Sequence, residues 1–206
     1  YEGDFYVDGQ WVRFQRGLPR KIWGYRAINK YLTQVSRGLH TFVQEQTIYC
    51  HSGSANYLER FTLDGNGNSS IITNRTPDTD FVGSDQNTWM FDVIYDQSST
   101  ANGLVAFVTP NNQCICSDNP GAIFIGDLLG TETLTPITLP PGILVNGGIV
   151  VLHPYLFYYG TAGIVGWSVP GVPTDLTGAG SGTARIAGQK IVKGLTLRAG
   201  SGSAPA

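Results

Sequence analysis

Cysteine and histidine side chains are the first residues in this chain that could bind a metal ion. Cys114 and Cys116 fall on one face of a predicted strand, because side chains along a strand alternate between its two faces. A zinc site needs two more ligands, and Cys50 and His51 would supply them only if folding brought the two pairs together. The wider spacing typical of zinc-binding cysteine pairs is absent. We therefore interpret the cysteines as small core residues and predict no metal site.

A second candidate for metal binding is segment 64–68, which reads Asp-Gly-Asn-Gly-Asn. Its oxygen-bearing side chains alternate as they do in calcium-binding loops. Such a loop also needs a glycine after the third ligand and a glutamate at its end. Ser69 and Arg75 stand at those two positions, so the match fails. The composition instead predicts the tip of a β-hairpin.

A glycine-rich segment near the C-terminal end has some features of a phosphate-binding loop. Residues 178–182 read Gly-Ala-Gly-Ser-Gly, and Gly188-Gln189-Lys190 follows. The spacing is one residue too long, glutamine separates the last glycine from the lysine, and no predicted strand comes directly before. We interpret this segment as a flexible connection between two sheets and predict no cofactor.

The residues that could catalyse a reaction form no known motif. The sequence contains no Gly-x-Ser-x-Gly elbow for a nucleophilic serine. A glycan-cleaving enzyme would need two carboxylates that converge in a cleft, and nothing in the sequence brings the available aspartates together. We predict no catalytic residue, while a glycan-degrading enzyme on a β-propeller stays an alternative. The histidines are His40, His51 and His153, and the aspartates considered are Asp92, Asp96 and Asp127.

Aromatic side chains are the remaining candidates for binding. Exposed aromatic rings stack on sugar rings or fill pockets on a partner protein, whereas buried rings belong to the core. The residues considered as contacts for a glycan or a partner are Trp23, Trp167 and Tyr158. A carbohydrate- or receptor-binding β module is therefore a second functional hypothesis.

The composition favours strands over helices. The chain has 206 residues, of which 27 are glycine and only 14% are charged. Glycine, asparagine, serine and threonine replace the missing charge, which suits short strands joined by tight turns. The formal net charge of −2 argues against a free binder of duplex DNA. Several basic residues nevertheless gather in the first 40 positions: Arg13, Arg16, Arg20, Lys21, Arg26, Lys30 and Arg37.

Sequence features also bear on where the protein acts. No apolar run is long enough to span a bilayer as a helix, and from the opening residues we expect no signal peptide. Three cysteines do not imply a disulfide framework, so a reducing site of synthesis is expected. Because the chain begins at Tyr1, we expect a segment of a longer polypeptide.

Short apolar runs between turn residues predict an all-β fold built from repeated units. An N-terminal hairpin and entry segment is expected over 1–37, and units are expected over 38–88, 89–141 and 142–184. A fourth unit begins in 185–206. The spacing of about 50 residues is that of antiparallel four-stranded blades of a β-propeller. A β-sandwich is the alternative, since it also has short, evenly spaced strands.

The expected strands follow period-two alternation. Asp8-Gly9 marks the turn of the N-terminal hairpin. In the first unit the strands are predicted at 41–44, 47–50, 58–62 and 70–73. In the second they are predicted at 90–94, 104–108, 114–116 and 122–125. In the third they are predicted at 148–152, 155–159 and 163–168, and the fourth unit begins with a strand at 191–197.

Two stretches of the chain resemble a known family. Residues 7–25 read VDGQWVRFQRGLPRKIWGY; residues 155–160 read YLFYYG, and residues 190–200 read KIVKGLTLRAG. Together they resemble the large β-propeller virion proteins of short-tailed bacteriophages, which form the tail hub or nozzle below the portal. Such proteins are often labelled packaged-DNA stabilisation or head-completion proteins. The opening stretch is the more distinctive of the two.

The resemblance implies a structural role and no catalytic residues. It implies a homo-oligomeric ring in the virion, made in the host cytoplasm. The ring would contact a portal-side adaptor and tail fibre or needle proteins. It would also enclose a channel through which DNA passes during ejection. A conduit should bind passing DNA weakly, and the net charge of −2 is compatible with that.

Overall fold

A computed structural model shows an all-β protein made of antiparallel strands. Among the residues it describes, the only helical element is a single 3₁₀ turn, η1 (Thr161–Gly163). The all-β prediction is therefore confirmed. The described residues are 12–16, 18–21, 31–44, 46–77, 88–95, 104–111 and 122–197.

The first sheet is an antiparallel meander of four strands in the order β3-β4-β5-β6. They are β3 (Gly38–Gln44), β4 (Thr47–Gly53), β5 (Leu58–Leu63) and β6 (Thr73–Asn74). The tight turn between β3 and β4 is possible because Gln46 adopts a left-handed backbone conformation, with φ of 66°. The first three strands lie where the sequence predicts them, and the fourth is shorter and begins later than expected.

The second sheet has the order β10-β9-β8-β7 and is again a sequential meander. Its strands are β7 (Thr88–Tyr95), β8 (Leu104–Asn111), β9 (Phe124–Asp127) and β10 (Thr135–Pro136). The sequence predicts the first three of these but not the short β10. The strand predicted at 114–116, which carries both Cys114 and Cys116, lies outside the described residues.

The third sheet has the order β11-β12-β13-β14. Its strands are β11 (Gly148–Leu152), β12 (Tyr155–Tyr159), β13 (Ile164–Trp167) and β14 (Gly182–Arg185). The first two match their predicted bounds, because β-branched and aromatic residues favour strands and His153-Pro154 separates them. The glycine-rich segment, predicted as a flexible connection between two sheets, instead lies between β13 and β14 of this one sheet and leads directly into β14.

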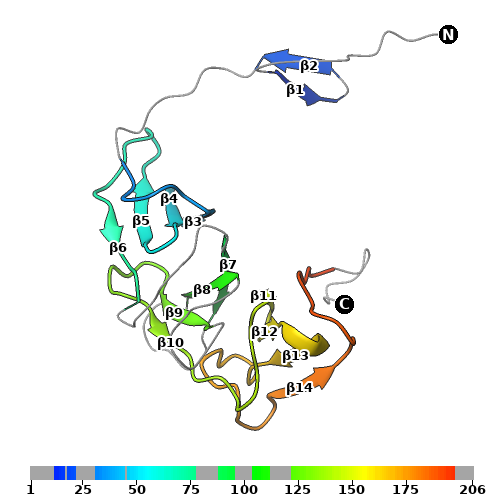
Figure 1. Cartoon of the computed structure of the whole chain (residues 1–206). Helices are drawn as coiled ribbons and strands as arrows, with labels where there is room; N and C mark the ends of the chain where they lie inside the picture. The colour runs from blue at the N-terminus through cyan, green and yellow to red at the C-terminus, as the bar shows by residue number, and fades with distance from the viewer. Residues whose placement is uncertain are drawn as a thin grey trace, which may run out of the picture.

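The three sheets lie side by side in a curved row (Figure 1). The first strand of the middle sheet, β7, lies beside β3 of the first sheet and beside β11 of the third. Alternation along β7 supplies both contacts: Trp89 packs in a cluster with Leu58, and Ile94 packs with Ile149. The middle sheet is thus covered on both of its faces, as a sheet with two apolar faces must be.

The ends of the row are partly covered by irregular segments. On the outer face of the first sheet, buried Glu59 accepts hydrogen bonds from the backbone and hydroxyl of Thr33, which holds residues 31–36 there. Beside the third sheet, the amide of Ile191 donates to the carbonyl of Gly160 over 3.1 Å. Residues 186–197 contain no strand, so the strand predicted at 191–197 is wrong: its backbone lacks the ladder of hydrogen bonds that defines one.

A two-stranded hairpin precedes the row. It pairs β1 (Val12–Gln15) with β2 (Leu18–Lys21), and Figure 1 shows it set apart from the three sheets. The turn predicted at Asp8-Gly9 lies outside the described residues. The turn between β1 and β2 begins at Arg16, whose φ is 53°.

The packing of the first two sheets predicts a strong effect at Gly53. A Cβ atom added there would lie 2.2 Å from Cγ and Cδ1 of the buried Trp89 ring, which is far inside van der Waals contact. We expect Gly53→Ala to lower the free energy of unfolding by about 1–3 kcal/mol, measured by urea denaturation. Gly65→Ala is the matched control, because no atom lies within 4 Å of a Cβ at that position. Equal stability of the two variants would contradict this packing.

Candidate functional site

A buried arginine joins the first and second sheets. Arg75 follows β6 and is 0% exposed. Its Nε donates to the carbonyl of Glu132 over 2.9 Å, and its own carbonyl accepts a hydrogen bond from the amide of Leu134. Burial, and after it the nearby positive charge of Arg60, lowers the pKa of the guanidinium to about 10. Since a buried charge is costly without partners, these contacts hold the loop between β9 and β10 onto the first sheet.

Arg60 on β5 makes a second contact of the same kind. Its Nη1 donates to the carbonyls of Leu129 and Gly130 in the same loop. The guanidinium also lies over the ring of Tyr49, 5.0 Å from its centroid, in a cation–π contact. Arg60 on β5 and Arg75 just after β6 therefore hold one loop of the second sheet.

His51 on β4 is the third polar residue at this contact between the first and second sheets, which we call the polar seam. Its Nε2 lies 3.3 Å from Nη1 of Arg75, and its ring is stacked on Phe42 and tilted against Phe91. Burial, followed by the positive charge of Arg75, lowers the pKa of His51 to about 3. The imidazole is neutral at physiological pH, so it can accept a hydrogen bond from Arg75. Little in the sequence indicated this contact, because a histidine and an arginine 24 positions apart form no motif.

A carboxylate links the second and third sheets. Asp92 on β7 accepts a hydrogen bond from the amide of Val151 on β11 over 2.8 Å, and its other oxygen accepts from the amide of Val93. Asp127 similarly accepts a hydrogen bond from the amide of Leu129. These two aspartates, considered in the sequence as possible catalytic carboxylates, thus have structural partners; Asp96 lies outside the described residues.

The far face of the third sheet carries an open aromatic groove of about 320 Å³. Tyr155, Phe157 and Trp167 line it. Phe157 and Trp167 sit opposite each other on β12 and β13. The indole Nε1 of Trp167 donates to the carbonyl of Gly180 over 3.1 Å, which fixes the ring while leaving its face toward the groove.

The groove follows from alternation along β12. Leu156 and Tyr158 point into the core between the second and third sheets, so Tyr155 and Phe157 point to the opposite face. Tyr158 is 0% exposed, and burial raises the pKa of its hydroxyl. The prediction that Tyr158 contacts a glycan or partner is therefore wrong, because its ring lies in the core.

The other two predicted contact residues have different outcomes. Trp167 lies in the groove and stays a candidate contact. Trp23 lies outside the described residues. Phe157 was not among the predicted contact residues, although its place two positions from Tyr155 on the same strand could have indicated a shared face.

The motifs dismissed as ligand sites serve local structure. Both carboxylate oxygens of Asp64 accept hydrogen bonds within its own turn, from the amides of Asn66 and Asn68 and the side chain of Asn68. In the glycine-rich segment, the hydroxyl of Ser181 donates to the carbonyl of Gly178 over 2.7 Å. Cys50 is buried, and burial raises the pKa of its thiol.

Two further findings concern the described part of the chain. Among these residues, no three histidine, cysteine or carboxylate side chains gather closely enough to hold a metal ion. No helix within the same ranges is long and apolar enough to cross a membrane.

No protein-family model matches the chain, and neither does any curated protein or solved structure.

The buried His51 predicts a pH dependence of stability. Its pKa is about 3 in the folded protein and about 6.5 when unfolded, so below pH 6.5 the unfolded state binds the proton more readily. Stability should therefore fall as the pH drops from about 6.5 toward 3. Between pH 7 and pH 5 we expect a loss of about 2 kcal/mol, measured by urea denaturation at each pH.

The matched comparison is between two histidine variants. His51→Gln should reduce this loss, whereas His153→Gln should keep it, because His153 is exposed. Burial also lowers the pKa of His40, so a smaller slope of the same sign should persist in His51→Gln. An unchanged slope in His51→Gln would show that His51 is not buried in its neutral form.

Proposed function

We propose that this chain is a structural protein of a bacteriophage tail, part of a hub or nozzle ring, and that its three sheets are consecutive blades of a β-propeller. The observation that carries this proposal is the aromatic groove on the far face of the third sheet. The equivalent faces within the row are packed against a neighbouring sheet. A further sheet on the groove would continue the same arrangement.

The position of the C-terminal segment supports the propeller. Neighbouring blades of a propeller pack face to face around a central channel, and here the first strands β3, β7 and β11 follow one another along the row. Gly194 comes next in this series: a Cβ there would lie 3.2 Å from Cγ1 of Val150 and 2.9 Å from Cε1 of Tyr159. Gly194 thus lies against the third sheet, and in this proposal a fourth blade would follow there.

A structural role in an assembly is also consistent with the contacts that the polar residues make. The buried Arg60 and Arg75 and the half-buried Asp92 bind backbone groups of neighbouring sheets, which would give the row the stiffness that a virion ring requires. In this proposal the partners are other copies of the ring protein, a portal-side adaptor and tail fibre or needle proteins. DNA passes through the ring without being held, in keeping with the low net charge.

The groove also gives a specific reason to keep glycan binding as a second candidate function. Aromatic rings such as Trp167 stack on sugar rings, but the groove is lined by Tyr155, Phe157 and Trp167, and these offer few of the polar groups that orient a sugar. This lining favours a protein partner. Glycan-array binding that Trp167→Ala abolishes without unfolding the protein would favour the second candidate.

Assembly can be tested on the purified chain. We expect sedimentation velocity to show self-association that rises with concentration, and negative-stain electron microscopy to show curved or ring-shaped particles. Association should survive moderate salt, because the groove is apolar and salt screening weakens only charged contacts. A monomer at every concentration, with no particles, would contradict a role in assembly.

A further inference from the structure

The N-terminal hairpin concentrates positive charge. Residues 12–21 read VRFQRGLPRK and contain four basic residues and no acidic one. Because the whole chain has a formal net charge of −2, the remaining residues together carry a formal charge of −6. The low net charge of the chain therefore hides a separation of charge between a strongly basic hairpin and an acidic remainder. The basic residues of the hairpin are Arg13, Arg16, Arg20 and Lys21.

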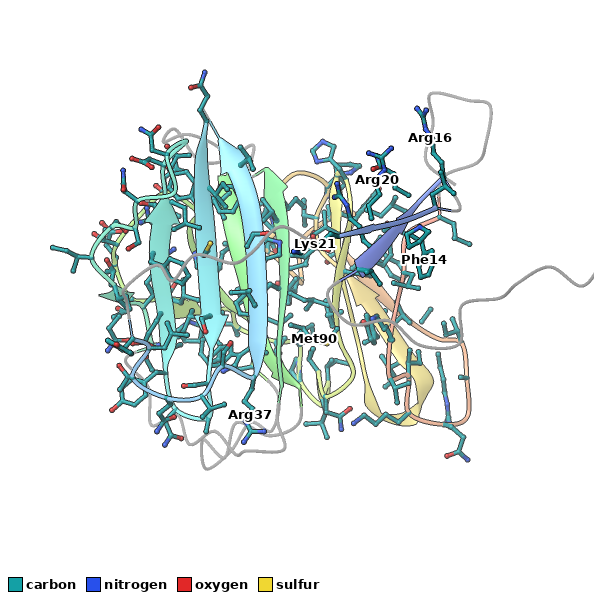
Figure 2. The ribbon with its side chains drawn as sticks, turned by 90° about the horizontal axis from the view of Figure 1, so that it is seen from above. Phe14, Arg16, Arg20, Lys21, Arg37 and Met90 are labelled. Carbon is teal, nitrogen blue, oxygen red and sulfur yellow. The ribbon has the colours of Figure 1, made fainter. Side chains whose placement is uncertain are left out.

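The four basic side chains of the hairpin are accessible to a ligand. All of them are exposed to solvent. Within the described part of the chain, none of the four side chains takes part in a hydrogen bond or an ion pair. Figure 1 shows the hairpin set apart from the three sheets, and Figure 2 shows Arg16, Arg20 and Lys21 along it. Their charge is therefore not used in packing the hairpin against the described sheets.

The register of the hairpin places two arginines directly opposite each other. Arg13 on β1 pairs with Arg20 on β2, and Gln15 pairs with Leu18 on the same face. Residues that stand directly opposite have their Cβ atoms about 5 Å apart, and like charges at such positions destabilise the pair. An anion bound between the two guanidinium groups would turn this repulsion into attraction. The pairing therefore favours an anionic ligand.

The other two basic residues extend the charge around the hairpin. Lys21 stands opposite Val12 and so lies on the second face, and Arg16 stands where the turn begins. A ligand with a single anionic group would reach only part of this set. A ligand with many anionic groups in a row would reach all of it, so a polyanion is the better fit.

The shape of the hairpin favours a nucleic-acid duplex among the polyanions. The major groove of DNA admits a two-stranded β-ribbon. A ribbon inside the groove has a phosphate backbone on each side, so basic side chains that leave it in different directions all find a partner. Arginine suits this ligand, because its planar guanidinium donates two parallel hydrogen bonds to one phosphate group. A flat acidic protein surface would meet only one face of the hairpin.

We propose that the β1–β2 hairpin enters the major groove of a DNA duplex and binds its phosphate backbones. The contacts are made by Arg13, Arg16, Arg20 and Lys21. They carry no sequence information, and they are weak at physiological salt because few phosphates are neutralised. Such a contact is compatible with DNA that passes without being held. The inference rests on the proposed function only for the source of the DNA.

Binding can be measured on the purified full chain by fluorescence anisotropy with a short fluorescein-labelled DNA duplex. We expect the Kd to rise steeply with salt, because each phosphate contact releases counterions. The double variant Arg13→Gln/Arg20→Gln should raise the Kd at least about tenfold at low salt and reduce the slope of log K against log salt by about 2. A change in the duplex sequence should leave the Kd of the wild type nearly unchanged.

The matched control removes the same charge outside the hairpin. Arg185 on β14 and Lys193 beyond it are both exposed, so Arg185→Gln/Lys193→Gln lowers the net charge equally and should keep the Kd within about twofold of the wild type. Arg13→Lys/Arg20→Lys keeps the charge but loses the planar guanidinium, so its Kd should lie between those of the wild type and the glutamine variant. Circular dichroism checks that each variant is folded.

Two results would overturn the hairpin contact. The first is an equal Kd for the glutamine variant and its matched control, which would show that only the overall charge matters. The second is competition by polyglutamate that equals competition by unlabelled duplex at the same concentration of charge. That result would identify an acidic protein as the partner in place of DNA.

Sedimentation velocity on the same samples separates this inference from the proposed function. If the wild type self-associates but does not bind the duplex, the hairpin contact is overturned while assembly stands. If the wild type binds the duplex through the hairpin but never self-associates, assembly is contradicted while the hairpin contact stands.

Discussion

A sheet with apolar side chains on both faces is stable in water only when both faces are covered. The middle sheet of this protein meets that constraint through β7, which sends Trp89 toward the first sheet and Ile94 toward the third. The row of sheets exists because of this requirement. At the ends of the row, residues 31–36 lie on the first sheet through hydrogen bonds such as those from Thr33 to Glu59, and the far face of the third sheet carries the aromatic groove.

Polar contacts then fix how the sheets sit against each other. Apolar packing alone allows two sheets to slide past each other. A hydrogen bond fixes their relative position, as Arg75 does with the Glu132 carbonyl and Asp92 does with the Val151 amide. The charged groups reach the backbone of the neighbouring sheet, so the contacts survive changes in the neighbouring side chains. Burial of Arg75 and His51 makes the seam between the first two sheets sensitive to the loss of either partner.

The sequence was informative where a strand is long and alternates strongly. Both β11 and β12 match their predicted bounds, because aromatic and β-branched residues fill them and His153-Pro154 breaks the run. The short β10 was missed, since two residues carry no periodicity and their pairing depends on β9. The strand predicted at 191–197 was wrong because an alternating pattern does not by itself supply the neighbour with which a strand must pair.

The candidate site was only partly predictable for a similar reason. Alternation along β12 places Tyr155 and Tyr158 on opposite faces, but it does not tell which face another sheet covers. Tyr158 lies in the core, whereas Trp167 lines the groove on the far face. In the sequence, Arg75 was notable only because it replaces the glutamate that a calcium-binding loop needs. Its burial between two sheets depends on a contact with a residue 57 positions away.

The most direct test of this account is a cryo-electron microscopy map of the assembled protein that resolves what lies on Tyr155, Phe157 and Trp167. The account predicts a β-sheet packed about 10 Å from the third sheet, as part of a closed ring of blades. Solvent over these three rings in an otherwise complete assembly would contradict it.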